Sequence, residues 1–286
     1  VFPDRTVLGG APFNVAAHLQ AFGLRPVLIS RLGHDALRDR VLGRMSERGM
    51  ETVGIQTDKN RPTGQVTVHE DEGGHRFEIL PLQAYDFIHP GVVRMITLSV
   101  HPALVYFGTL AQRGEMSRRA LSAMLRSSDA PKFLDINLRQ PWVDEATIKS
   151  SLENADILKL NEEELTSVAA MTGLAERPAR EQARELMQRY DLERIVVTCG
   201  DRGAWMSSRD GKDIEAVPPP PSGEVVDTVG AGDGFAAVYI LGMLRRWTMA
   251  DTLRRANAFA AALCGVRGAV PEQADFYAPF IAEWHL

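Results

Sequence analysis

The segment 225–235 carries the clearest chemical signal in the chain. It reads Val-Val-Asp-Thr-Val-Gly-Ala-Gly-Asp-Gly-Phe and leads into a stretch with helical spacing. Small residues at 230–232 let the backbone approach a ligand, and the free N–H groups of a helix start attract an anion. Asp233 at the mouth of this anion hole is placed to accept the proton of an attacking hydroxyl during phosphoryl transfer. The alternative is a purely structural role, in which Asp233 is a favourable acidic residue in the first helical turn and the glycines form a tight strand-to-helix turn.

A second motif stands near the start of the chain. Gly9-Gly10-Ala11-Pro12-Phe13-Asn14 leads into a helix at 15–19. Two glycines allow close approach of a polyhydroxy ligand, and an Asn amide both donates and accepts hydrogen bonds with adjacent hydroxyls. The two motifs together therefore favour phosphoryl transfer to a hydroxylated small molecule.

An alternating pattern of strands and helices must position these motifs. Segments with helical spacing separate short apolar runs, at 27–29, 104–107, 132–135, 156–160 and 195–198. This pattern predicts a parallel sheet with crossover helices, hence an α/β core. A run of four Pro residues occupies 218–221. Two further helices are predicted after it, one over 231–246 and one over 249–266.

The residue pattern changes between Thr52 and Phe87. Residues 63–69 and 76–80 alternate between apolar and polar types, and Asp71-Glu72-Gly73-Gly74 is a turn signal. We expect a β-hairpin that belongs to a small sheet and covers the active site as a lid. Gly64 would lie in this lid. The alternative is a surface hairpin with no role at the site. The predicted division assigns 10–51 and 87–286 to the nucleotide- and sugar-binding core, and 1–9 and 52–86 to the lid.

Composition narrows the class of function. Hydrophobic residues make up 45% of the 286 residues and charged residues 24%, and no apolar run is long enough to cross a bilayer. A net charge of −5 argues against non-specific nucleic-acid binding. Cys199 and Cys264 suggest neither a disulfide framework nor a zinc site. We expect a cytoplasmic protein with small-molecule partners and without nucleic-acid or membrane partners.

The chain resembles the PfkB-type carbohydrate kinases of the ribokinase family. The resemblance rests on Gly9-Gly10-x-x-x-Asn14 and Asp227-Thr228-x-Gly230-Ala231-Gly232-Asp233, in this order, and it spans nearly the whole chain. A phosphate loop of the G-x-x-x-x-G-K-[ST] type is absent from the sequence. The resemblance implies a ribokinase-like three-layer core, with a mainly parallel central sheet flanked by helices, plus a small β-sheet lid.

The resemblance also implies the sugar site and the catalytic site. Asp233 is the implied base, and Gly230, Ala231 and Gly232 form the implied anion hole. The sugar is oriented by residues of both motifs and by the Asp-x-Asn-x-Arg segment, namely Gly9, Gly10, Asn14, Arg139 and Asp233. A planar Arg fork after a strand suits sugar oxygens or the transferred phosphate, and a surface salt bridge is the alternative for Arg139.

ATP and Mg²⁺ are the implied cosubstrate and cofactor. The implied nucleotide contacts come from the turn after a strand, a late helix and the anion hole: Asn161, Thr198, Gly200, Gly203, Gly232 and Asn257. Asn161 and Glu164 share a helix face, so Glu164 is expected to hold Mg²⁺ through water. A helix cap is the alternative for the two residues, and both roles can hold together. Asp227 and its loop resemble the loop that binds a monovalent cation in several relatives. The sequence does not decide whether the protein requires K⁺.

The form Gly-Gly-Ala-Pro-Phe-Asn-Val-Ala, together with Asp-x-Asn-Leu-Arg, is similar to bacterial fructokinases, so fructose is the expected substrate. Alternatives are 2-keto-3-deoxygluconate, aminoimidazole riboside, and a non-catalytic sugar or nucleotide sensor of the same fold. Relatives usually carry a buried strand with an acidic sugar ligand ahead of the segment matching Val1-Phe2-Pro3, and we expect the native protein to have both. A homodimer through the lid is a further expectation.

Overall fold

The central layer of the protein is a six-stranded sheet. The computed structural model describes residues 8–71, 74–174, 177–219 and 225–286. The strand order is β10-β9-β8-β7-β6-β5, in which β5 to β8 are parallel to one another and β9 pairs antiparallel with both β8 and β10. The strands of this sheet are β5 (Val105–Phe107), β6 (Lys132–Asp135), β7 (Ile157–Asn161), β8 (Arg194–Thr198), β9 (Ala204–Ser208) and β10 (Asp213–Ala216).

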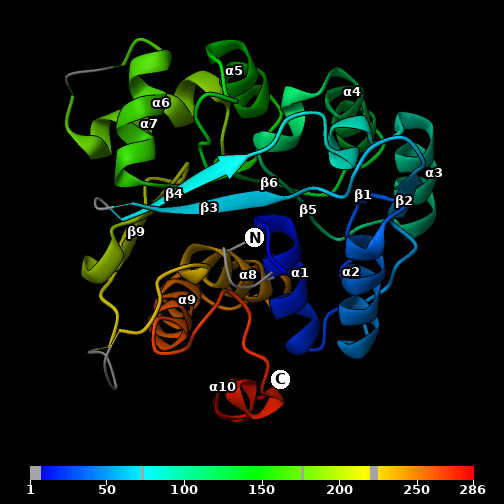
Figure 1. The fold of residues 1–286 in the computed structure, drawn as a ribbon. Coiled ribbons are helices and arrows are strands. Elements are labelled where there is room, and N and C mark those ends of the chain that lie inside the picture. The colour runs from blue at the N-terminus through cyan, green and yellow to red at the C-terminus, as the bar shows by residue number, and fades with distance from the viewer. Residues whose placement is uncertain (1–7, 72–73, 175–176, 220–224) are drawn as a thin grey trace.

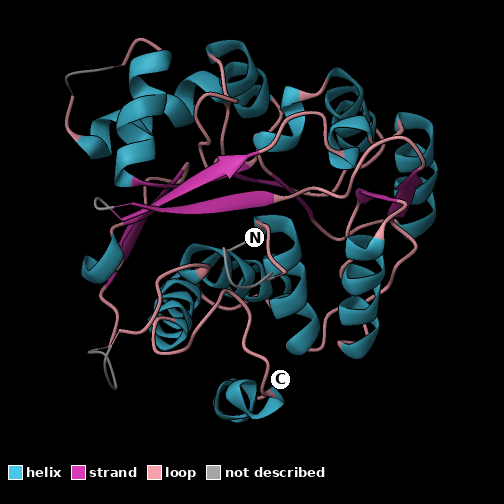
Figure 2. Cartoon of the chain, in the orientation of Figure 1, coloured by secondary structure: helices cyan, strands magenta, loops and turns pink. Residues whose placement is uncertain are grey.

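Four further strands of the described residues lie outside this sheet. Two of them form a parallel pair, β1 (Ser30–Gly33) with β2 (Ile55–Asp58). The other two form an antiparallel hairpin, β3 (Val66–Asp71) with β4 (Gly74–Ile79). Figure 2 shows this hairpin as a long two-stranded arm, separate from the central sheet.

Helices cover both faces of the central sheet, as Figure 1 shows. The α-helices are α1 (Ala11–Ala21), α2 (Ala36–Glu47), α3 (Pro90–Val100), α4 (Glu115–Arg126), α5 (Glu145–Glu153), α6 (Glu162–Met171), α7 (Ala179–Tyr190), α8 (Ala231–Leu244), α9 (Met249–Leu263) and α10 (Ala278–Trp284). The 3₁₀ turns are η1 (Ala84–Phe87), η2 (Leu110–Arg113), η3 (Gly200–Arg202) and η4 (Ala274–Tyr277). No helix in the described ranges is long and apolar enough to cross a membrane.

The apolar strands β6 to β8 bury side chains on both faces, as parallel strands in a three-layer fold do. Leu134, Leu158 and Val197 belong to the core on the side of α4 to α7. Phe133 and Ile157, the neighbours of the first two in sequence, belong to the core on the side of α1, α8 and α9. The α/β core predicted from the alternation, and the three-layer arrangement implied by the resemblance, are therefore confirmed.

Side-chain caps fix where several helices begin. Asp35 accepts a hydrogen bond from the N–H of Arg38 at 2.9 Å at the start of α2, and Asp144 accepts one from Thr147 at 2.7 Å at the start of α5. Such caps satisfy N–H groups that have no partner within the helix. They also place the start of each helix directly after the preceding loop, where site residues lie.

The predicted strand at 27–29 is shifted, because the structure has only an isolated bridge at Val27 and places β1 at Ser30–Gly33. Strand β2 falls in the range predicted for the lid, yet it pairs with β1 of the predicted core. Residues 1–7 of the predicted lid segment 1–9 lie outside the described residues. The division of the chain into core and lid stays a prediction.

Candidate active site

The two motifs meet at the start of α8. The Nδ2 of Asn14 donates a hydrogen bond of 2.7 Å to Oδ2 of Asp233, across a separation of 219 residues. Asn14 lies in the first turn of α1 and is 4% exposed. Its Oδ1 is buried without a hydrogen-bond partner among the described residues, which is costly unless a ligand hydroxyl donates to it.

Gly230 gives α8 its starting geometry. Its φ of 85° is left-handed, and a Cβ at this position would lie 2.4 Å from the Cβ of Ala269. Only glycine fits both conditions without strain. The sharp turn it allows places Asp233 in the first turn of the helix.

The start of α8 provides backbone donors for an anion. The first N–H groups of a helix have no partner within it. In this turn the N–H of Ala231 already donates to the carbonyl of Thr228 at 3.3 Å. Of the three predicted donors, Gly230 and Gly232 are therefore the better placed to receive a phosphoryl group.

The loop before α8 is tied to the loop after α9. Oδ1 of Asp227 accepts from the N–H of Val229 at 2.9 Å, and its Oδ2 accepts from the N–H of Gly268 at 3.0 Å. These bonds use one lone pair on each oxygen of Asp227, so the carboxylate organises the loop. The predicted monovalent-cation role of Asp227 stays a prediction.

Charged groups of both signs surround Asp233. Partial burial raises the pKa of its carboxyl, and the charge of Asp135 raises this pKa further. The hydrogen bond from Asn14 and the charges of Lys159 and Arg139 oppose the rise without cancelling it. A carboxylate whose pKa is raised toward neutrality is a better proton acceptor than an ordinary surface Asp.

The other predicted sugar contacts are Gly9, Gly10 and Arg139. A Cβ at Gly9 or Gly10 would meet no atom of the described residues within 4 Å. Arg139 is exposed, and its Nη1 donates to the carbonyl of Leu138 at 3.2 Å. Gly64, which was predicted to lie in the lid, comes just before β3, and a Cβ there would come within 2.4 Å of the ring of Tyr85.

Asn161 and Glu164 form a reciprocal cap at the start of α6. Oδ1 of Asn161 accepts from the N–H of Glu164 at 2.8 Å, and Oε2 of Glu164 accepts from the N–H of Asn161 at 3.0 Å. Oε1 of Glu164 also accepts from the N–H of Leu138 at 2.8 Å. The capping interpretation of this motif is thus observed in the structure.

The cap is compatible with a magnesium role. A carboxylate has about four lone-pair positions, and two of those on Glu164 are used by N–H groups. The remaining positions fit the waters of a hydrated Mg²⁺, which is usually held by one or two carboxylates and the substrate phosphates. Within the described part of the chain, no three His, Cys, Asp or Glu side chains cluster as a direct metal site.

The predicted nucleotide residues line the carboxyl end of β8 and its neighbours. Gly200 and Gly203 have φ values of 62° and 92°, and a Cβ at Gly203 would lie 2.2 Å from the carbonyl oxygen of Ala216. Thr198 Oγ1 lies 3.5 Å from the carbonyl of Leu160. Asn257, 5% exposed, donates to the carbonyl of Ala216 at 2.7 Å. These contacts position the turn, and direct contact of these residues with a nucleotide stays a prediction.

Three residues near Asp233 were not predicted as site residues. Lys159 of β7 and Asp135 of β6 form an ion pair, with 2.9 Å between Nζ and Oδ1. Tyr106 of β5 donates its O–H to Oδ2 of Asp135 at 3.1 Å. A charged residue inside an apolar strand was the available signal, since Lys159 stands within Ile-Leu-Lys-Leu.

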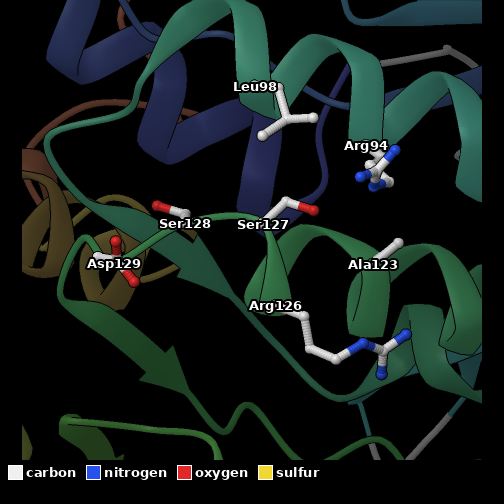
Figure 3. A pocket seen from close by; sticks show the side chains of 7 residues that line it. All are labelled: Arg94, Leu98, Ala123, Arg126, Ser127, Ser128 and Asp129. Carbon is white, nitrogen blue, oxygen red and sulfur yellow. The ribbon is translucent and has the colours of Figure 1, made fainter.

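A hollow of the surface lies away from this site. It has a volume of about 370 Å³ and lies between α3 and α4 (Figure 3). Its lining residues are Arg94, Leu98, Ala123, Arg126, Ser127, Ser128 and Asp129. The last three precede β6, so the hollow is at the amino-terminal edge of the sheet, whereas Asp135 and Asn161 mark the carboxyl-terminal edge. Ligands of open α/β sheets bind at the carboxyl edge.

Comparison with known proteins decides the family. The model of the family described as pfkB family carbohydrate kinase matches residues 4–274. This chain belongs to the pfkB family of carbohydrate kinases. The match covers both motifs, and the motif-based prediction of the family is confirmed.

Individual relatives share only modest sequence identity with this chain. "Probable fructokinase-5" of Arabidopsis thaliana is 28% identical over 280 residues, which cover 92% of this chain and 84% of the relative. A solved fructokinase of Xylella fastidiosa with bound ATP has a TM-score of 0.81 at 21% identity and covers 97% of this chain and 91% of its own. A Burkholderia thailandensis nucleoside kinase in complex with inosine has a TM-score of 0.79 at 21% identity, with coverages of 99% and 90%. These structures share the ribokinase-like fold with this chain.

Proposed function

We propose that this carbohydrate kinase transfers the γ-phosphoryl group of ATP to a hydroxyl group of fructose. The observation that carries the proposal is the 2.7 Å hydrogen bond between Asn14 and Asp233. It joins the expected sugar-orienting residue to the expected base, at a helix start suited to binding an anion. Sugar, base and phosphoryl group would thereby meet at one point.

In this mechanism Asp233 accepts the proton of the sugar hydroxyl while the hydroxyl oxygen attacks the γ-phosphorus. The bond between that phosphorus and the β–γ bridging oxygen breaks, and ADP leaves. The N–H groups of Gly230 and Gly232 stabilise the charge on the transferring group. Mg²⁺, when bound near Glu164, would neutralise charge on the phosphates.

Asn14 has a double role in this account. Its amide nitrogen orients the Asp233 carboxylate, and its unpartnered Oδ1 is available to accept a hydrogen bond from a second sugar hydroxyl. Gly9 and Gly10 leave room beside it, and Arg139 adds a positive charge that acts on Asp233. These features suit a polyhydroxy acceptor.

Fructose is proposed over other acceptors on two grounds. The Gly-Gly-Ala-Pro-Phe-Asn-Val-Ala and Asp-x-Asn-Leu-Arg segments resemble fructokinases. The Arabidopsis relative that covers 92% of this chain is also named a probable fructokinase. A sensor without catalysis would have no need of a carboxylate at position 233 beside free helix N–H groups.

The proposal is tested by ADP release from Mg-ATP with fructose, ribose, 2-keto-3-deoxygluconate, aminoimidazole riboside and adenosine, each over a range of concentrations. We expect the highest kcat/KM with fructose. A higher kcat/KM with another acceptor would replace the substrate and keep the mechanism. Binding of ATP without turnover of any acceptor would favour a sensor.

A further inference from the structure

A buried ion pair lies beside the start of α8. Nζ of Lys159 is 2.9 Å from Oδ1 of Asp135, and the two side chains are 7% and 2% exposed. The strand register places the two residues opposite each other on β7 and β6. Tyr106 donates to the second oxygen of Asp135 at 3.1 Å. The three side chains form one hydrogen-bonded group, which we call the 106–135–159 cluster.

Packing alone does not account for this cluster. Phe133 and Ile157, two residues earlier on the same strands and on the same face, are fully buried apolar residues. Replacing a buried ion pair by apolar residues of similar volume is often neutral or stabilising, because both charges lose their hydration on burial. An ion pair on an otherwise apolar sheet face therefore indicates a role beyond stability.

The position of the cluster indicates what that role is. A Cβ at Gly232 would lie 3.7 Å from Nζ of Lys159, which places the ammonium group directly beside the anion hole. Lys159 and Asp135 both act on the carboxyl of Asp233, with opposite signs. Charges in a buried site are screened far less than in water, so these effects are substantial.

We propose that Lys159 is a positioning residue for phosphoryl transfer. Held in place by Asp135 and Tyr106, its ammonium group keeps Asp233 ionised and adds positive charge next to the anion hole. The inference rests on the proposed function, since it takes Asp233 as the base.

The titratable groups that bear on Asp233 come from three strands and one loop. Tyr106 faces it from β5, Asp135 from β6, Lys159 from β7 and Arg139 from the loop after β6. Helix α1 contributes the neutral Asn14, and Glu164 of α6 acts on Lys159. Burial lowers the pKa of Lys159, but Asp135, Glu164 and Asp233 together outweigh this effect, so the pKa is raised and the amine stays charged.

The test compares two variants in which residue 135 is neutral. Asp135→Asn keeps the amine of Lys159, whose pKa Glu164 and Asp233 still raise, and Asp135→Asn with Lys159→Met removes the amine. The pKa of Asp233 is measured directly by NMR of ¹³C-labelled aspartate carboxyls, with the resonance assigned by its absence in Asp233→Asn. We expect this pKa to be higher in the double variant by about one unit. Equal values in the two variants would overturn the proposal.

Tyr106→Phe serves as the matched control, because it removes a hydrogen bond from the cluster without changing a charge. We expect it to leave the pKa of Asp233 close to the wild-type value. A shift as large as that between the two charge variants would mean that local repacking controls Asp233, and would overturn the proposal. The titration needs no substrate, so an absence of turnover would contradict the proposed function and leave this comparison standing.

The double variant also allows a second measurement, which applies even if Asp135→Asn alone does not fold. It leaves no unpaired buried charge at positions 135 and 159, so we expect it to fold. We expect its kcat to fall by about tenfold or more while the KM for the sugar stays near that of the wild type. A folded double variant with wild-type kcat would show a purely structural role for the pair.

Discussion

At the scale of single residues, Asp233 is set apart from an ordinary acidic first-turn residue by its neighbours. It accepts a hydrogen bond from Asn14, a residue of the distant first motif. Its pKa is raised by burial and by Asp135, and the opposing effects of Asn14, Lys159 and Arg139 do not cancel the rise. The side chain is thus partly desolvated yet connected to groups that support its charged form, as a general base requires.

A pH dependence follows from this pKa. A base works only when it is deprotonated, so kcat/KM is full above the pKa of Asp233 and is lost as the pH falls through it. Because the pKa is raised, we expect the acid limb to lie above the usual Asp value of about 3.9. Initial rates at subsaturating sugar between pH 4 and 8 would measure the limb. The KM for ATP, measured over the same pH range, distinguishes protonation of ATP from protonation of Asp233. Full activity down to pH 4 would contradict the prediction.

At the scale of elements, the start of α8 depends on close packing against the loop after α9. Gly230 combines a left-handed φ of 85° with an approach of 2.4 Å between its virtual Cβ and Ala269. The glycines of the motif therefore serve the turn geometry as well as the anion hole. A side chain here would displace the backbone donors themselves.

We expect Gly230→Ala to cost more than backbone strain alone. Gly23 is the matched control, because its φ is 80° but a Cβ there would meet no atom within 4 Å. Gly23→Ala should cost about 1 kcal/mol of unfolding free energy and leave kcat unchanged. Gly230→Ala should cost more and lower kcat by about tenfold or more, because the anion hole is displaced. Urea unfolding and steady-state rates measure both, and equal effects of the two changes would count against this packing.

His18 is the buried residue that ties α1 to the C-terminal segment. Its Nδ1 lies 2.9 Å from the hydroxyl oxygen of Tyr277, and its Nε2 lies 3.0 Å from the carbonyl oxygen of Ala269. Burial lowers the pKa of His18 to about 4, outweighing the opposing hydrogen bond with Ala269. The imidazole is therefore neutral in the folded protein at neutral pH.

Stability should therefore fall on acidification. The unfolded chain binds a proton at His18 near pH 6.5 and the folded chain only near pH 4, so stability is complete above 6.5 and is lost between these values. The full loss from this residue is about 3 kcal/mol. Urea unfolding at pH 7, 6 and 5 should show a steeper decline for the wild type than for His18→Gln. Parallel declines would mean that His18 does not contribute.

Sequence reasoning predicted the elements that carry continuous apolar runs. Strands β6, β7 and β8 and helices α8 and α9 lie close to their expected positions, because buried parallel strands and apolar helices leave a clear pattern. Strand β1 was misplaced, since Ser30–Gly33 is poor in apolar residues and is defined by pairing with β2. Local pattern does not contain such pairing information.

The site was predictable only in part for the same reason. The glycines, Asn14 and Asp233 stand in recognisable motifs, but their mutual contact spans 219 residues. Lys159 is a single charged residue in a strand, and only the register between β6 and β7 shows that it faces Asp135. The cap made by Asn161 and Glu164 was an open alternative in the sequence, and the structure shows its hydrogen bonds.

At the scale of the whole molecule, the β3–β4 hairpin is joined to the core at one end. Arg113 of η2 donates to the carbonyl of Leu80 at 2.6 Å, to the hydroxyl of Tyr85 at 2.8 Å and to Asp86 at 2.8 Å. Leu80 directly follows β4, so these bonds hold the base of the hairpin. A hairpin anchored at its base is suited to closing over a site and excluding water.

We expect the hairpin to act as this lid. Val66 and Ile79 are partners in the strand register, so the backbone at the two ends is close enough for a short Gly-Ser linker to replace 66–79. The shortened protein should have a lower kcat for the sugar and an increased ratio of ATP hydrolysis to sugar phosphorylation. Unchanged values would contradict a lid role.

Sedimentation of the wild type and of the shortened protein would test the predicted homodimer through the lid.

The most direct test of the central claim is transfer of the γ-phosphoryl group from labelled ATP to fructose by the wild type and by Asp233→Asn. Asparagine keeps the size of the side chain and removes its capacity to accept a proton. We predict that the wild type forms labelled fructose phosphate and that the variant is slower by about a thousandfold, with unchanged affinity for ATP. Transfer by the variant within about tenfold of the wild-type rate would contradict the assignment of Asp233 as the base.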